Sequence, residues 1–392
     1  MVAESATRFA ALEAQAAGIM ETFQAAGFEP VAPAILQPAS LFLDRIGESI
    51  RSRTYVFTDN DGEELCLRPD LTVPVCRLYL ERHPEADAEA RYCYNGPAFR
   101  YQPGGGDRVR PREFRQAGIE MIGEGPPENA EAEVLALALE VLRKSGLEKF
   151  RIRFGDLGLF GALVDALDIP DRWRMRLRHF FWRPQAFRDL LRALAGGDGR
   201  PVIPGNGKLL GKLDPGDPEA AQDVVAAHLE EQGIPLIGDR TLAEITERLL
   251  DKAADLREAP LPKETIDLIE GYLAVAGPPR AALARIEDLV SAAGLTLGDS
   301  LALFQHRLDL FAEREIDLAG AQFSAEFGRD FEYYSGFVFQ VEVPDMGRGG
   351  QVAGGGRYDN LLSDIGAPRP VPAIGAAIHT ERLLAMVRGE GE

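Results

Sequence analysis

Hydrophobic positions follow a helical period at the start of the chain and alternate in several later stretches. Residues 5–26 repeat apolar side chains every three or four positions and stop at Gly27, which predicts an amphipathic helix that ends there. Residues 55–57 and 65–67 are apolar and flank the turn sequence Asp-Asn-Asp-Gly at 59–62. This pattern predicts a β-hairpin.

A second hairpin is predicted from residues 92–99 and 114–122, with a glycine-rich break between them. Because side chains alternate along a strand, Gln116, Gly118 and Glu120 share one face of the second strand. A glycine between an amide and a carboxylate leaves a flat floor for a small molecule, and a cationic amine suits those two groups. A solvated strand face beside a basic surface loop accounts for the same residues equally well, so both interpretations stay open on this stretch alone.

The remaining pattern separates a mixed region from a helical one. A helix over 129–146 and a strand over 150–154 complete the mixed region, and sheet-like alternation returns at 321–343. The sequence between them loses almost all β character. These changes predict an α+β protein with a core from 1–156 and 321–392 and a mostly helical insertion at 157–320. The longer helices expected in the insertion cover 218–232, 240–256, 263–276 and 278–293.

Composition changes this picture modestly. The chain has 392 residues, of which 45% are apolar and 27% charged, as in ordinary soluble domains. Its net charge of −19 argues against a surface built to coat nucleic acid, because phosphate contacts need concentrated Lys and Arg. The aromatic, arginine-rich stretch at 172–188 permits an RNA-binding surface, although an amphipathic helix packed on the core or on a partner fits it better.

Cysteine usage and the N-terminal residues point to the cellular setting. Cys66, Cys76 and Cys93 lack metal-site spacing and are too few for a disulfide framework, so we expect reduced core thiols. The N-terminal residues contain neither the apolar block of a signal peptide nor a membrane span. We therefore expect a cytoplasmic protein without a membrane contact, a metal or a cofactor.

The segment FRYQPGGGDRVRPREFRQAGIEMIG resembles the second signature motif of class II aminoacyl-tRNA synthetases, and of histidyl-tRNA synthetase in particular. In that family the first arginine, Arg100 here, and the loop arginines hold ATP and the aminoacyl phosphate. The resemblance implies that Gln116 and Glu120 hold the histidine substrate. Asp70 and Thr72 align with the Glu-Gly-Thr that holds its amino group, although Asp70 is shorter than the family glutamate and also suits a helix N-cap.

Three later segments resemble the same family. GRDFEYYSG resembles Arg-Gly-Leu-Asp-Tyr-Tyr-Thr-Gly, which implies that Arg329 assists catalysis and that Tyr333 and Tyr334 bound the imidazole pocket. A glutamate stands in place of the family aspartate in this segment. Residues 354–359 resemble a glycine-rich segment in which bare backbone approaches a ligand, and AIGAAIHTERLLAMV resembles the third motif, with Arg382 at the position that stacks on adenine.

The resemblance covers about 1–155 and 321–392 and implies a class II synthetase-like antiparallel sheet flanked by helices. The departures concentrate on the ATP side. Gln102 stands where class II enzymes keep a glutamate, and His379 replaces a glycine that makes room for the nucleotide. A synthetase also continues past the third motif into an anticodon-binding domain, for which few residues follow here.

A retained amino-acid site with an altered ATP site resembles the regulatory subunit of ATP phosphoribosyltransferase, a synthetase relative required by a short catalytic partner in the first step of histidine biosynthesis. The resemblance implies a non-catalytic regulator that mediates feedback by histidine, binds the short catalytic subunit and also pairs with itself through its N-terminal helix and the strand after it. Contact with tRNA is not expected. The residues expected to bind histidine are Asp70, Thr72, Arg100, Gln116, Glu120, Arg329, Tyr333 and Tyr334.

Two other functions remain open at this point. A histidyl-tRNA synthetase-like enzyme that activates histidine is favoured by Arg100, Arg329 and Arg382. An RNA-binding module would use the arginines of 172–188.

Overall fold

The computed structural model describes residues 5–43, 48–106, 110–196, 207–234, 241–328 and 333–390. These residues form two compact units, one made of Met1–Ala166 and Gly271–Glu392 and the other of Leu167–Glu270. The second unit is narrower than the predicted insertion at 157–320. The difference has a physical reason, because helix α14 (Ser300–Glu313) packs on the core strand β7 (Arg151–Asp156), with the rings of Phe311 and Phe154 5.5 Å apart.

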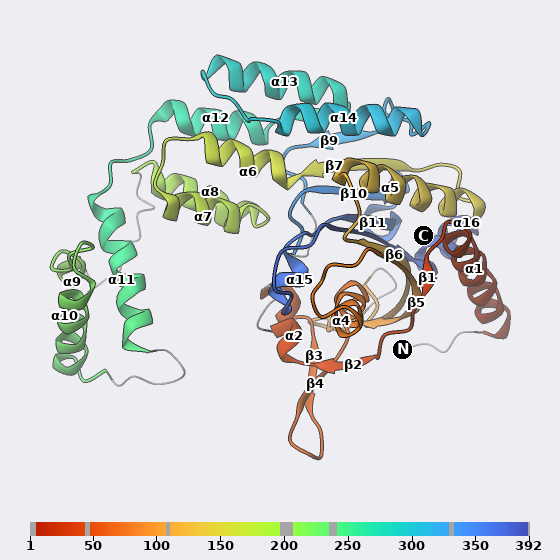
Figure 1. Ribbon diagram of the computed structural model, residues 1–392, viewed down its shortest axis with the longest axis horizontal. Helices are drawn as coiled ribbons and strands as arrows, with labels where there is room; N and C mark the ends of the chain where they lie inside the picture. Colours follow the sequence, from red (N-terminus) through yellow and green to blue (C-terminus); the bar gives the residue numbers. More distant parts are fainter. Residues whose placement is uncertain are drawn as a thin grey trace. The chain divides into compact units, whose positions relative to one another are not determined.

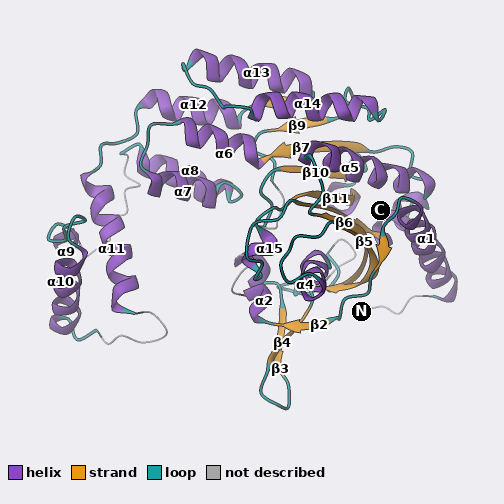
Figure 2. Ribbon diagram, viewed as in Figure 1, coloured by secondary structure: helices purple, strands orange, loops and turns teal. Residues whose placement is uncertain are grey.

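A nine-stranded sheet forms the centre of the first unit (Figures 1 and 2). Its central strands are antiparallel, while the pairs β1–β5 and β7–β9 are parallel. The predicted α+β class is therefore confirmed. In spatial order the strands are β1 (Glu29–Pro30), β5 (Ala90–Phe99), β6 (Glu113–Ile122), β12 (Ala373–His379), β11 (Gln351–Arg357), β10 (Phe337–Glu342), β7, β9 (Gln322–Ser324) and β8 (Ala276–Gly277).

Helices pack against this sheet as the apolar periodicity predicts. Helix α1 (Ala6–Ala25) begins at Ser5, whose hydroxyl accepts a hydrogen bond from the Arg8 N–H at 3.3 Å, and it ends before Gly27, which has a φ of 87°. The other helices of this unit include α4 (Thr72–Arg82), α5 (Pro127–Lys144), α6 (Leu157–Ala166), α13 (Pro279–Ala292), α15 (Leu361–Asp364) and α16 (Thr380–Val387), with a 3₁₀ turn at Gly347–Gly350.

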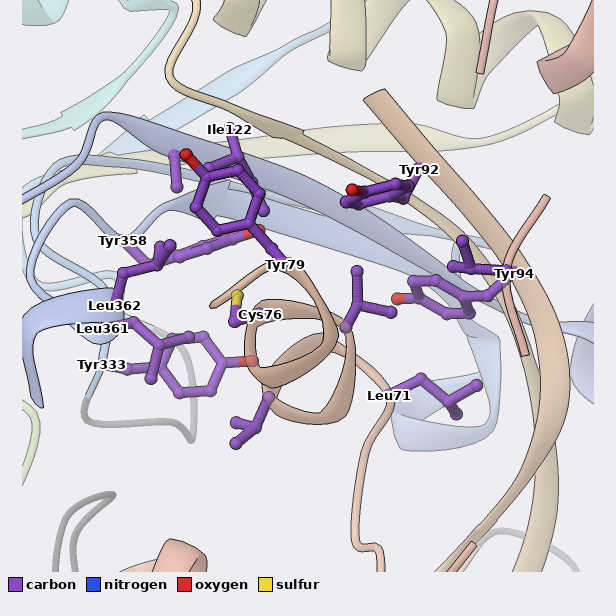
Figure 3. Packing of buried hydrophobic residues seen from close by; sticks show 14 of the residues in the cluster. Leu71, Cys76, Tyr79, Tyr92, Tyr94, Ile122, Tyr333, Tyr358, Leu361 and Leu362 are labelled. Carbon is purple, nitrogen blue, oxygen red and sulfur yellow. The ribbon is translucent and has the colours of Figure 1, made fainter. Parts of the chain in front are cut away.

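One cluster of buried side chains joins α4 to the sheet and lies directly beside the candidate site (Figure 3). Tyr94, Tyr333 and Tyr358 surround the start of α4 together with Leu71 and Cys76. Aromatic side chains bury large areas, and their hydroxyls need partners when they leave water. The cluster therefore supplies both packing and hydrogen-bond donors near Asp70.

A small separate sheet carries the first predicted hairpin, which is confirmed. Its order is β2 (Leu36–Pro38), β4 (Glu64–Leu67) and β3 (Tyr55–Thr58), with the short helices α2 (Ser40–Leu43) and α3 (Glu48–Arg51) before the hairpin. The β3–β4 hairpin projects away from the large sheet (Figure 1).

The described secondary structure of the second unit consists of helices. Asp255 on α11 accepts hydrogen bonds from Arg172 at 2.8 Å, from the Trp173 indole at 2.7 Å and from Arg176. These bonds account for part of the cationic stretch at 172–188 as internal packing. The helices are α7 (Asp171–Phe180), α8 (Pro184–Leu194), α9 (Gly207–Leu210), α10 (Pro218–Glu231), α11 (Leu242–Arg257) and α12 (Lys263–Leu273), the last of which continues into the first unit. Within the described ranges, no helix is long and apolar enough to cross a membrane.

Candidate functional site

A cavity of about 320 Å³ in the first unit brings most of the predicted site residues together. This volume lies at the small end of the range for ligand sites, so it suits a molecule of amino-acid size. Arg329 lies outside the described residues. The cavity is lined by Arg53, Asp70, Thr72, Arg100, Arg110, Gln116, Arg153, Phe327, Gly328, Tyr333, Tyr334, Gln340, Gln351, Tyr358, Gly375, Ala376, Ala377, His379 and Arg382.

Asp70 forms part of the cavity wall where the small sheet leads into α4. Its Oδ1 accepts a hydrogen bond from the Val73 N–H at 3.3 Å, which is the helix-start contact that its sequence position suggested. Its Oδ2 lies 3.5 Å from the Tyr333 hydroxyl. Burial raises the pKa of Asp70 to about 6, although the nearby Arg100 guanidinium opposes this shift. Since each carboxylate oxygen accepts two hydrogen bonds, the side chain can cap the helix and still accept from a ligand.

Glu120 is fully buried and does not line the cavity itself. Its Oε1 accepts from the Tyr94 hydroxyl at 3.1 Å, and its Oε2 accepts from the Tyr358 hydroxyl. The carboxyl lies against Gly375 of the neighbouring strand, where any Cβ would overlap Oε2. Burial raises the pKa of Glu120 to about 8, and hydrogen bonds from Tyr358, Thr72 and Tyr94 only partly offset that effect.

The predicted floor at Gly118 is not open to a ligand. Gly118 lies on the same face of β6 as Gln116 and Glu120, as the alternation requires, but a Cβ at this position would overlap the Tyr94 hydroxyl. The glycine therefore makes room for Tyr94 to reach Glu120. The prediction failed because the sequence of one strand does not reveal what its neighbour places over it.

The two tyrosines at 333 and 334 also differ from expectation. The alternation across 321–343 would place adjacent residues such as Tyr333 and Tyr334 on opposite faces of a strand, but β10 begins only at Phe337. The two rings lie with centroids 4.7 Å apart, and Tyr333 also meets Tyr358 edge to face at 5.8 Å. Both tyrosines therefore line the same cavity.

Gln116 offers an unused acceptor at the cavity. Its side chain is 3% exposed, and its Oε1 accepts no hydrogen bond from any described residue. A buried amide oxygen without a donor costs free energy, so the position favours a ligand that brings an N–H.

Five arginines also line the cavity. Arg53, Arg100, Arg110, Arg153 and Arg382 line it from five separate segments. The Arg100 guanidinium lies 4.8 Å from the centre of the Phe114 ring and donates to the Pro69 carbonyl at 2.9 Å.

A pair of rings lies beside Arg100. The rings of Phe114 and His379 have centroids 5.2 Å apart, and His379 also lines the cavity. Gln102, the second predicted departure from the synthetase pattern, is 6% exposed. The described residues contain no group of three or more His, Cys, Asp or Glu side chains that could hold a metal ion.

A buried ionic network includes the residue that precedes Tyr358 in the sequence. Glu131 on α5 accepts from Arg307 on α14 and from Arg357 at the end of β11, and Arg307 also donates to Asp156 at 2.6 Å. Arg357 immediately precedes Tyr358. The network thereby fixes the backbone from which Tyr358 reaches Glu120.

Tyr94, Tyr358 and Gly375 contact Glu120 and were not assigned a role from the sequence. A signal was available for Tyr358, because it follows the glycine-rich run at 354–356 that was expected near a ligand. Tyr94 and Gly375 carried no local signal, since only the pairing of β5 and β12 with β6 brings them to Glu120.

Comparison with known proteins identifies the family of this chain. The family model described as histidyl-tRNA synthetase matches residues 5–213 and 219–383. The chain is 34% identical to the ATP phosphoribosyltransferase regulatory subunit of Mesorhizobium japonicum, over 97% of this chain and 98% of that protein. The chain belongs to the ATP phosphoribosyltransferase regulatory subunit family. A member from Agrobacterium fabrum is also 34% identical, over 95% and 96% of the two chains.

Solved structures support the fold of this family member. A Bacillus halodurans structure titled as an ATP phosphoribosyltransferase regulatory subunit/histidyl-tRNA synthetase has a TM-score of 0.68 at 20% identity, covering 99% of this chain and 82% of the other. A histidine–tRNA ligase subunit from Alicyclobacillus acidocaldarius has a TM-score of 0.61 at 23% identity, covering 100% and 97%. These likenesses show the predicted class II synthetase-like fold.

Proposed function

We propose that this chain is a non-catalytic, histidine-sensing subunit of an ATP phosphoribosyltransferase. Membership of the regulatory subunit family supports a regulatory role in histidine biosynthesis. The observation that carries the sensing role is that Asp70, Gln116 and Tyr334 line one cavity of a volume suited to one amino acid.

Histidine binds with its cationic groups toward these acceptors. Asp70 and Thr72 accept from the ammonium group, while the orphaned Gln116 oxygen takes an N–H of the ligand. Glu120, beneath Gly375, supplies the buried carboxyl for the same face, and Tyr334 lies near the ring. Arg100, close to Asp70, supplies the charge that the ligand carboxylate needs.

The nucleotide side of the cavity does not support adenylate formation in this proposal. His379 projects beside Phe114, in the region where a class II enzyme keeps space for adenine, and Gln102 lacks the carboxylate of the synthetase pattern. A pocket that binds an amino acid without activating it is suited to sensing.

Sensing requires a second site whose equilibrium the ligand biases, and that site belongs to a short ATP phosphoribosyltransferase chain. The two chains form a hetero-oligomer in which this subunit raises catalytic activity and transmits inhibition by histidine. Differential affinity of histidine for the active and inhibited states provides the coupling free energy.

Mixing the purified chains and measuring phosphoribosyl transfer tests the proposal. We expect higher activity with this subunit than without it, and inhibition by histidine that Glu120→Ala relieves. If the catalytic chain is equally active and equally inhibited alone, this chain has no regulatory role. Full inhibition in the Glu120→Ala complex would place the sensing site elsewhere.

A histidine-activating enzyme is the second candidate, because Arg100 and Arg382 both line the cavity. ATP–pyrophosphate exchange separates the two functions. Histidine-dependent exchange by the purified chain would support the enzyme and exclude the purely regulatory role.

A further inference from the structure

Two buried carboxyl groups belong to one cluster beside the cavity and are connected by hydroxyl groups. Asp70 is 2% exposed and Glu120 is 0% exposed. The Tyr333 hydroxyl lies 3.5 Å from Asp70 Oδ2 and also contacts Thr72, whose hydroxyl bonds to Glu120. Two carboxylates in one buried cluster repel each other, so the cluster favours a state in which one of them keeps its proton.

Positive charge reaches one of these carboxyls and not the other. Arg100 and Arg68 both face Asp70. The oxygens of Glu120 accept from tyrosine hydroxyls, and no described Arg, Lys or His side chain forms an ion pair with them. A buried carboxyl without a counter-charge retains its proton, and burial accordingly raises the pKa of Glu120 to about 8. The groups that face Glu120 are Tyr92 and Tyr94 from β5, Thr72 and Cys76 from α4, Tyr358 after β11, Tyr333 before β10 and Asp70 before α4, while β12 contributes only the backbone of Gly375.

Two hydroxyl groups connect Glu120 to the cavity. Glu120 does not line the cavity itself, but Thr72 and Tyr358 do, and both hydrogen-bond its carboxyl. A ligand ammonium group held by Asp70 and Thr72 therefore lies one hydroxyl group away from Glu120. A positive charge at such short range favours the ionised form of a carboxyl.

We propose that a ligand ammonium group at Asp70 and Thr72 displaces the proton of Glu120, which leaves by way of the Tyr358 hydroxyl to solvent. The O–H bond of the Glu120 carboxyl breaks, the carboxylate keeps the electron pair, and no other covalent bond changes in net terms. The inference rests on the proposed binding of histidine in this cavity. It adds that the ligand is recognised in exchange for a proton, so that the response to histidine depends on pH.

The direction of the pH dependence follows from the two states of the site. The empty site holds the Glu120 proton up to a pKa of about 8, because the carboxyl is buried, whereas the occupied site loses that proton at lower pH. Binding near neutral pH therefore releases about one proton, and the affinity rises about tenfold for each pH unit. Above the pKa of the empty site the proton is already absent, so the affinity becomes constant.

Calorimetric titration of the full chain with histidine, at pH 7 in two buffers of different ionisation enthalpy such as PIPES and HEPES, counts the protons released. We expect about one proton per histidine, and a dissociation constant that falls about tenfold from pH 6.5 to pH 7.5. Glu120→Gln has no carboxyl proton to lose, so it should bind more weakly and retain only the small contribution of the imidazole of the ligand. Glu113→Gln, at the exposed start of β6, should behave as the unchanged chain does.

Two further measurements identify the groups involved. Imidazolepropionate, which is histidine without its amino group, should bind more weakly and release no proton from the protein. Tyr358→Phe removes a hydrogen bond that lowers the pKa of Glu120, so the rise in histidine affinity should move to higher pH.

Histidine binding without proton release, or equal release by the unchanged chain and Glu120→Gln, would overturn this inference and leave histidine sensing intact. Equal proton release with imidazolepropionate would show that the ammonium group is not what displaces the proton. A chain that binds no histidine between pH 6 and pH 9 would overturn the proposed function, and this inference with it.

Discussion

The carboxyl groups beside the cavity are held by hydrogen bonds from the sheet and from helix α4, while the arginines that line the cavity come from separate segments. Glu120 receives two tyrosine hydroxyls and lies against a glycine, and Asp70 caps a helix. Among the arginines, Arg382 donates to the Gln351 carbonyl at 3.1 Å, and Arg153 lies 4.7 Å from the centre of the Phe327 ring. These carboxyl groups are thus preorganised, which lowers the cost of binding a ligand beside them.

This difference determines which residues of the cavity can change without disturbing the others. Buried, mutually bonded carboxyls are expensive to rearrange, because each lost partner leaves an unsatisfied polar group. Side chains on separate segments change independently, so the nucleotide end tolerates a ring such as His379 without disturbing Glu120. Each prediction below tests one side of this comparison.

The largest effect is expected from Gly375→Ala. A Cβ at this position overlaps Oε2 of Glu120 and lies 2.8 Å from the Ile119 carbonyl oxygen, so both the strand and the carboxyl must shift. We expect the free energy of unfolding to fall by about 3 kcal/mol and histidine binding to be lost. Gly125→Ala is the matched control, because a Cβ there meets nothing within 4 Å. Chemical denaturation and calorimetry check both outcomes, and a stable Gly375→Ala that binds histidine would contradict the preorganised site.

Glu120→Ala should weaken histidine binding by roughly 2–3 kcal/mol, because the hydroxyls of Tyr94 and of the cavity-lining Tyr358 lose their buried partner. Titration calorimetry measures the change. Glu113→Ala, at the exposed start of the same strand, should leave the affinity unaltered. Unchanged affinity in Glu120→Ala would move the ligand away from this face.

The stability of the protein should fall as pH rises through the titration of Glu120. The folded chain holds the Glu120 proton up to a pKa of about 8, whereas the ordinary value is 4.5, so the folded state binds more protons within that window. The contribution is complete below pH 4.5 and is lost by about pH 8, with a loss of about 2 kcal/mol after discounting for relaxation of the site. Thermal denaturation from pH 5 to 8.5 should show a flatter profile for Glu120→Gln, and identical profiles would argue against a protonated carboxyl.

The smallest effect is expected at the nucleotide end. The unchanged chain should give no histidine-dependent ATP–pyrophosphate exchange, and His379→Gly should bind ATP about tenfold more tightly, or about 1.4 kcal/mol, because removal of the imidazole opens space beside Phe114. Fluorescence or calorimetric titration with ATP measures the change. Thr380→Ser, at the next position, is a conservative control for the start of α16, and equal ATP affinity in all three chains would show that His379 is not the obstacle.

Local pattern predicted much of the fold. The 3.6-residue period identified α1 and α5 to within two residues at each end, and turn chemistry located the β3–β4 hairpin. These features depend on neighbours in sequence, where propensity and alternation act directly. The sheet-like stretch at 321–343 forms two strands, β9 and β10, instead of one. Alternating residues form a strand only where a neighbouring strand lies close enough to pair with them.

The site was predictable only in part, for a related reason. Asp70, Thr72 and Gln116 were identified by family resemblance, and the cavity brings them together. The groups that hold Glu120 come from strands on either side of β6, so their role depends on register between distant segments. The opening assigned to Gly118 failed in the same way, because Tyr94 fills it from the adjacent strand.

The ionic network around Glu131 constrains how this protein changes over evolutionary time. Glu131 accepts from two guanidinium groups that come from helix α14 and from the end of β11, and all three side chains are at most 7% exposed. Losing one member leaves an uncompensated buried charge, at a cost of about 3–5 kcal/mol, whereas replacing the whole set by apolar residues is nearly neutral. Single mutational steps at positions 131, 156, 307 and 357 therefore pass through poorly folded intermediates, and we expect these positions to vary together, or not at all, among related sequences.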